Sequence, residues 1–190
     1  MTVTQQIYCM ALHPRGELFQ LEDTDGLVQQ LTELGLLGEA FTVAGETRYK
    51  LGERFYQLLS FMGCAPALRL EPDRPGDEKF CHFRFINDAQ TVFRYLRPEV
   101  KARCPDCRKP GDSANDIRQS CFEGQQDWNC PHCQTAHRLS DINWKHEAGV
   151  GRFFLELIDV HPHEVVPTDK LLNDLNRMTG QDWEYFYAVM

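Results

Sequence analysis

Apolar residues at helical spacing predict two helices in the first third of the chain. The first helix has an apolar stripe, and Asp23 or Thr24 is positioned to cap its N-terminus. That stripe consists of Leu27, Val28, Leu31 and Leu34. We expect the second helix within residues 52–63, where Gly63 would end it. Its apolar positions are Phe55, Leu58, Leu59 and Met62.

Runs of aromatic and branched residues predict three strands before position 100. Residues 5–12 are expected to form the first strand. Residues 80–86 and 91–96 are expected to form two more strands, separated by a turn at Asn87 and Asp88.

The last forty residues predict a strand, a helix and a strand. Residues 151–160 are rich in aromatic and branched residues, which predicts a strand buried on both faces for most of its length. Thr168 is a suitable N-cap for the helix, and Gly180 stands where a C-terminal glycine is expected. The helix stripe is Leu171, Leu172, Leu175 and Met178. Residues 183–189 form the second strand, and the three elements resemble a βαβ-like or split α+β unit.

These elements predict an α+β fold, with a mixed sheet and helices on one side of it. The length of 190 residues allows one domain that carries a small inserted module. No apolar run reaches the length of a membrane span, and the start of the chain lacks the pattern of a signal peptide. We therefore expect a cytoplasmic protein, in which paired cysteines are more often metal ligands than disulfides.

Two CPxC elements, at 104–107 and 130–133, carry the strongest chemical signal. Two residues between the cysteines let one tight turn direct both sulfurs to one point, and the proline presets the backbone of that turn. Two such turns supply four thiolates in tetrahedral arrangement, and the expected ligands are Cys104, Cys107, Cys130 and Cys133. Zn²⁺ is the expected ion, and iron is a less common occupant of the same site. A redox dithiol of the thioredoxin kind would need only one pair, placed between a strand and a helix.

The segment 97–145 resembles a zinc ribbon, built from two knuckles of the rubredoxin type. Members of that family usually place Gly or a basic residue directly after each CPxC element. Arg108 matches this pattern, and Gln134 departs from it. The resemblance implies a structural metal site in an insert, with residues 1–96 and 146–190 forming the α+β body.

A site closed by four cysteines has no open position for water or substrate, so a catalytic metal is not expected. Our leading hypothesis is a non-enzymatic adaptor whose ribbon presents a rigid hairpin to a protein partner. The alternatives are a nucleic-acid-binding ribbon and an enzyme with its active site in the α+β body. The oligomeric state is left open.

The charge distribution bears on these alternatives. The net charge is -8, and residues 97–145 carry eight basic and seven acidic side chains between two acidic flanks. This balance disfavours a large phosphate-binding surface and suits a partner with a basic surface. A nucleic-acid site would use Trp128 or Trp144 for stacking. Its phosphate contacts would be Lys101, Arg103, Arg108, Lys109, Arg118 and Arg138, although cations near the cysteines are better explained as neutralising the metal site.

The remaining candidate residues have simpler explanations. Cys121 is expected to be a half-buried thiol, His137 a surface histidine and Cys64 a packed core cysteine. A second metal site would combine Cys81 and His82 with His161, His163 and Glu164. Adjacent strand residues point to opposite faces, so loop histidines are the preferred interpretation.

An aromatic run near the C-terminus suggests one more surface. Tyr185 and Tyr187 lie two residues apart and would form an interaction patch if they point outward.

Overall fold

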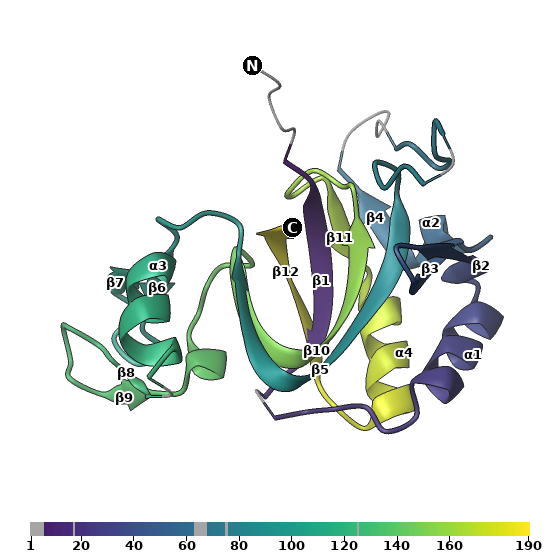
Figure 1. Cartoon of the computed structure of the whole chain (residues 1–190). Helices are drawn as coiled ribbons and strands as arrows, with labels where there is room; N and C mark the ends of the chain where they lie inside the picture. The colour runs from purple at the N-terminus through teal and green to yellow at the C-terminus, as the bar shows by residue number, and fades with distance from the viewer. Residues whose placement is uncertain (1–5, 17, 63–67, 75, 125) are drawn as a thin grey trace, which may run out of the picture.

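The structure is a computed structural model that describes residues 6–16, 18–62, 68–74, 76–124 and 126–190. It confirms the α+β class: a six-stranded sheet is accompanied by helices, as Figure 1 shows. The sheet order is β12-β1-β10-β5-β3-β2. Its strands are β1 (Tyr8–Pro14), β2 (Leu37–Val43), β3 (Glu46–Leu51), β5 (His82–Tyr95), β10 (Ala148–Ile158) and β12 (Trp183–Val189).

Every pair of neighbouring strands in this sheet is antiparallel, whereas the sequence analysis expected a mixed sheet. The difference arises because β1 lies between β10 and β12 in the sheet. Strands β10 and β12 both run antiparallel to β1, so they share one direction with β1 between them. The strand-helix-strand unit of the last forty residues is therefore the split form.

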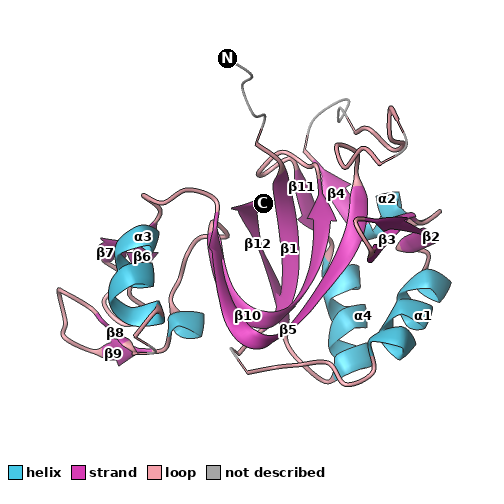
Figure 2. Cartoon of the chain, in the orientation of Figure 1, coloured by secondary structure: helices cyan, strands magenta, loops and turns pink. Residues whose placement is uncertain are grey.

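Two long helices cover one face of the sheet, as Figure 2 shows. They are α1 (Thr24–Leu34) and α4 (Asp169–Thr179). The Asp23 carboxylate accepts the Gly26 N–H at the start of α1, and the Thr168 hydroxyl accepts the Leu171 N–H at the start of α4. The predicted stripes lie in the main core against β1, β10 and β12, which confirms both helices. No helix of the described residues is long and apolar enough to cross a membrane.

The helix expected within residues 52–63 is wrong beyond its first turn. Helix α2 is only Phe55–Leu58, and strand β4 (Leu59–Phe61) follows it and pairs with β11 (Val165–Pro167). The Leu58 carbonyl accepts the N–H and the hydroxyl of Thr168, which ties this segment to the start of α4. Met62 is consequently 65% exposed instead of packed. Gly63 and Cys64 lie outside the described residues.

The predicted turn at Asn87 and Asp88 is also wrong, because β5 runs through it without a break. Asn87 lies opposite Phe153 of β10, and Val92 lies opposite Gly151, so the register shifts between these two pairs. Residues 88–91 of β5 stand there against the single residue Arg152 of β10, which makes an irregularity in the pairing of the two strands. Strands β5 and β10 bend strongly at this level, as Figure 1 shows.

The bend brings the start of β10 against the outer edge of β12. The Tyr187 N–H donates to the His146 carbonyl at 2.8 Å. A side chain at Gly149 would collide with the Phe186 ring, since an added Cβ would lie 2.2 Å from it. The missing side chain at Gly149 therefore allows the bent strand to close over the face opposite the helices, where a smaller core cluster includes Cys9, Phe154 and Phe186.

Tyr187 does not form the outward patch expected from the sequence. It is 1% exposed, and its hydroxyl donates to the Val165 carbonyl at 2.6 Å. Phe186 is buried on the opposite face, so both faces of β12 are covered, and Tyr185 is half-buried.

A separate hydrophobic cluster holds the segment between β5 and β10. Its elements are β6 (Lys101–Arg103), β7 (Pro110–Ser113), α3 (Ala114–Ile117), a π-helical turn (Arg118–Phe122), β8 (Trp128–Asn129), β9 (Ala136–His137) and a 3-10 turn (Leu139–Asp141). Phe93, Ala148 and Val150 of the bent strands belong to the same cluster. The segment is thus packed onto the far ends of β5 and β10. The division into residues 1–96, 97–145 and 146–190 stays a prediction.

Two histidines are buried in the neutral form. His82 directs Nδ1 to the Phe80 carbonyl at 2.8 Å and Nε2 to Arg48 at 3.1 Å, which fits a neutral ring that donates once and accepts once. His13 packs edge-on against Phe186. Burial lowers the pKa of each to about 4.

We predict that stability falls with acid below the ordinary histidine pKa of 6.5. Below pH 6.5 the histidines of the unfolded chain become protonated, whereas the two buried histidines of the folded chain stay neutral until about pH 4. The free energy of unfolding therefore decreases between these two pH values, by up to about 3 kcal/mol per histidine. Urea unfolding across this range should show a shallower decline for His13→Phe than for the unmodified protein. The four cysteines of the CPxC elements titrate in both proteins, so their contribution cancels in the difference. An equal decline of stability with pH in the two proteins would contradict the conclusion that His13 is buried in the neutral form.

Candidate metal centre

The structure brings together the four cysteines predicted as ligands. Their Sγ atoms all lie within 4.8 Å of one another. The four residues are Cys104, Cys107, Cys130 and Cys133. The Sγ atoms of Cys104 and Cys133 are 3.6 Å apart, and those of Cys107 and Cys130 are 3.7 Å apart. No other group of this kind occurs among the described residues.

These distances fit a tetrahedral ion. Zn–S bonds of about 2.3 Å place the corners of a tetrahedron about 3.8 Å apart. A disulfide would require about 2.05 Å, and all four cysteines are free. The spacing therefore matches four sulfurs around one metal ion. The identity of the metal does not follow from the distances.

The two knuckles have the same local geometry. In the first, the Cys104 N–H donates to the Lys109 carbonyl at 3.1 Å, and the Arg108 N–H donates to the Cys104 carbonyl at 3.0 Å. The second knuckle repeats both bonds 26 positions later, at 3.0 and 2.9 Å, from Cys130 and Gln134. Each CPxC element therefore closes a turn that directs its sulfurs to the shared point.

The residue after each CPxC element adopts left-handed backbone. The φ angle is 60° at Arg108 and 61° at Gln134. Glycine takes this conformation without steric cost, which is a physical reason for glycine to be frequent at this position of zinc ribbons. Gln134 departs from that pattern in sequence, but its backbone follows the same path as Arg108.

The thiols of Cys133 and Cys107 differ in pKa because their surroundings differ. The hydroxyl and the backbone N–H of Thr135 lower the pKa of Cys133 to about 6. At Cys107 the Lys109 N–H acts in the same direction, but burial and the neighbouring thiols outweigh it and raise the pKa to about 11. A bound cation would favour all four thiolates, because metal ligation requires deprotonated sulfur.

His137 lies beside the four cysteines and not on the surface, so the prediction of a surface histidine was wrong. Its Nε2 is 3.3 Å from the Cys104 Sγ and 3.8 Å from an oxygen of Asp106, and its side chain is 9% exposed. The short pairing of β9 with β8, in which His137 lies opposite Trp128, fixes this position. A donor here can stabilise a thiolate ligand.

The basic side chains expected to neutralise the cysteine sulfurs do not contact them directly. The side chains of Arg103, Arg108 and Lys109 make no hydrogen bond to the sulfurs in the described part of the chain. The His132 backbone N–H does reach the Cys130 Sγ, at 3.4 Å.

The weaker candidates do not join a metal site. Cys121 is half-buried, as predicted, with its sulfur 3.4 Å from the Ser120 hydroxyl. Cys81 packs in the main core, while the neighbouring His82 points to Arg48 on the other face. The second site proposed for Cys81 and His82 with His161, His163 and Glu164 is not found among the described residues.

Both tryptophans that the nucleic-acid alternative would use for stacking are buried. Trp128 is 2% exposed and Trp144 is 5% exposed. The Trp128 ring passes over Gly111, where an added Cβ would lie 2.4 Å from it, and its Nε1 donates to Asp112 at 2.8 Å. Both belong to the cluster that contains Cys104.

Comparisons with family models, curated proteins and solved structures gave no match to this chain. The resemblance to a zinc ribbon therefore rests on the residues and the geometry described here.

We predict about one metal ion per chain in protein purified without added metal, and close to none after Cys104→Ser or Cys130→Ser. A serine oxygen cannot replace a buried thiolate in a four-sulfur site. Elemental analysis of the purified proteins measures this. The matched control is Cys121→Ser, which removes a thiol outside the cluster and should keep its metal. Equal loss in all three variants would mean that the cluster is not the site.

Proposed function

We propose that the protein is a zinc-binding, non-enzymatic adaptor, in which a structural Zn²⁺ on the four cysteines holds residues 97–145 in a fixed shape for a protein partner. The observation that carries this proposal is the closed set of four sulfurs. Four protein ligands complete the tetrahedral coordination of zinc, so the ion would contribute folding energy and no open coordination position. Iron in the same site is the alternative for the metal.

The packing around the sulfurs supports a structural role. Cys104 and Cys130 are buried and belong to the same hydrophobic cluster as Trp128 and Trp144. Helix α3 and the short strands of this segment have few residues each, so they offer little apolar surface of their own. An ion bound at the cysteines would therefore stabilise the whole cluster.

The buried tryptophans weigh against the nucleic-acid alternative, since neither offers a stacking surface. Acidic flanks on either side of the segment fit a basic protein surface instead. We place the protein in the cytoplasm, because the thiols must stay reduced to bind a metal.

Metal removal tests the structural role. We predict that a strong chelator releases the metal and shifts the emission of Trp128 and Trp144 to the red, and that added Zn²⁺ reverses the shift. The variant Trp183→Phe leaves only these two reporters. In the matched double variant Trp128→Phe with Trp144→Phe, only Trp183 of the main core remains, and its emission should stay unchanged. Unchanged emission in Trp183→Phe after complete metal loss would contradict a structural metal.

A further inference from the structure

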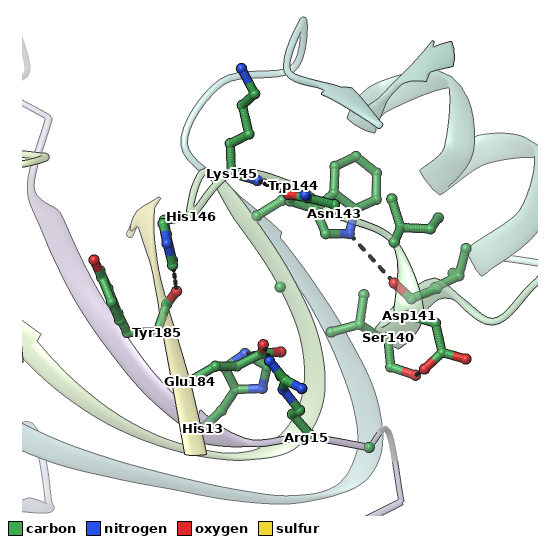
Figure 3. Close-up of a pocket in the computed structure, with 16 residues that line it drawn as sticks. His13, Arg15, Ser140, Asp141, Asn143, Trp144, Lys145, His146, Glu184 and Tyr185 are labelled. Atoms are coloured by element: carbon green, nitrogen blue, oxygen red, sulfur yellow. Dashed lines mark hydrogen bonds and ion pairs between the residues drawn. The ribbon is translucent and has the colours of Figure 1, made fainter. Parts of the chain in front are cut away.

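The loop that leads from the segment between β5 and β10 back to the sheet borders a cleft of about 480 Å³, as Figure 3 shows. The Glu184 carboxylate in this cleft already pairs with Arg15 at 3.1 Å. Ala148 and Val150 of its wall are 5% and 1% exposed, so β10 offers no free edge there. None of these contacts points to a ligand. A side chain beside the four cysteines, by contrast, points to the metal centre.

That side chain is His137, which meets the centre at one corner. Its Nε2 lies 3.3 Å from the Cys104 Sγ, and the side chain is 9% exposed. His137 is not a member of the group whose ligand atoms all lie within 4.8 Å of one another. A further ligand to an ion between the four sulfurs would have to lie near all of them. His137 therefore contacts the ligand Cys104 from outside the coordination shell of a bound ion.

The other three sulfurs receive hydrogen bonds from backbone N–H groups of their own knuckles. These donors are Lys109 for Cys107, His132 for Cys130 and Thr135 for Cys133. Asp106 occupies the place in the first knuckle that His132 occupies in the second, but in the described part of the chain its N–H makes no hydrogen bond to the Cys104 Sγ. Among the described residues, His137 Nε2 is the only nitrogen atom that hydrogen-bonds to this sulfur. A side chain that follows the second knuckle thus completes the set of four donors.

Two acceptors lie near His137 Nε2, and the sulfur is the better placed of the two. A neutral imidazole carries one N–H, and a thiolate has no proton of its own to donate. The Asp106 carboxylate is 3.8 Å from Nε2, which is beyond hydrogen-bond distance, and its side chain is 58% exposed. This geometry fits the tautomer whose hydrogen lies on Nε2 and is donated to Cys104.

The imidazole is held in place by the strand pairing around it. His137 lies opposite Trp128 in the pair of β8 and β9, with the two ring centroids 6.1 Å apart. Trp128 is itself 2% exposed, and its Nε1 donates to Asp112 at 2.8 Å. The ring of His137 therefore lies beside a buried and anchored indole, and it needs no rearrangement to reach the sulfur. An outer partner held in this way orients the ligand and favours metal binding.

We propose that His137 is a positioning residue of the metal centre, which holds the Cys104 thiolate through an Nε2–H···Sγ hydrogen bond and slows release of the metal. The assignment rests on the proposed function, since it requires a metal ion on the four cysteines. It adds to the centre a residue that the two CPxC elements do not contain.

Transfer of zinc from the full chain to a colorimetric chelator measures how firmly the metal is held. We expect His137→Leu to bind zinc and to release it at least about tenfold faster, because loss of an outer hydrogen-bond partner costs about 10–100-fold in metal affinity. His137→Gln keeps an N–H donor and should restore most of the retention.

The matched control is His132→Leu. It removes a histidine of the second knuckle whose Nε2 lies 2.9 Å from the Pro110 carbonyl and contacts no sulfur. The backbone N–H of residue 132 still donates to Cys130, so this variant should release zinc at the unmodified rate.

Cadmium in place of zinc gives a readout that a merely structural role would not produce. In the isotopically labelled full chain loaded with NMR-active cadmium, the hydrogen on His137 Nε2 should couple weakly to the metal through the Cys104 sulfur. The same spectrum identifies the tautomer. A direct one-bond coupling between cadmium and a nitrogen of His137 would overturn the proposal, because it would make His137 a ligand.

Zinc-loaded His137→Leu that releases its metal at the unmodified rate would overturn the proposal, as would equal acceleration in His132→Leu. A hydrogen on Nδ1 in place of Nε2 would overturn it as well. Metal content is measured on the same samples. These three results would leave the proposed structural zinc intact, whereas unmodified protein that binds no metal would refute both proposals.

Discussion

The convergence of four cysteine sulfurs is the constraint on which the segment between β5 and β10 depends. Sulfurs less than 4 Å apart would repel one another as thiolates, and a cation bound between them would offset that repulsion. Two turns with the same hydrogen bonds bring the sulfurs there, and Cys104 and Cys130 continue directly into the hydrophobic cluster. The four cysteines and the small core are therefore contiguous, and the core is packed onto the ends of two bent strands.

The features that were predictable from sequence are those fixed by neighbouring residues. Helices α1 and α4 begin at side-chain caps and end at left-handed glycines, and both signals are local. The CPxC spacing likewise encodes its own turn, so the four cysteines could be assigned without a structure. Strand β10 was recognisable because its second half is rich in aromatic and branched residues.

The features that were missed are fixed by contacts far apart in the chain. Leu59 continues a helical stripe, but its pairing with Pro167 makes it a strand residue. Asn87 looks like a turn residue, but it lies in a continuous strand because its pairing with Phe153 of β10 extends β5 through this position. His137 reaches Cys104 only because β8 and β9 pair.

X-ray absorption at the zinc edge, on protein purified without added metal, tests the central claim most directly. The account predicts a single shell of four sulfurs at about 2.3 Å. That result would establish one tetrahedral zinc on the four cysteines. A shell with nitrogen or oxygen ligands, or protein without metal whose cysteines form disulfides, would contradict it.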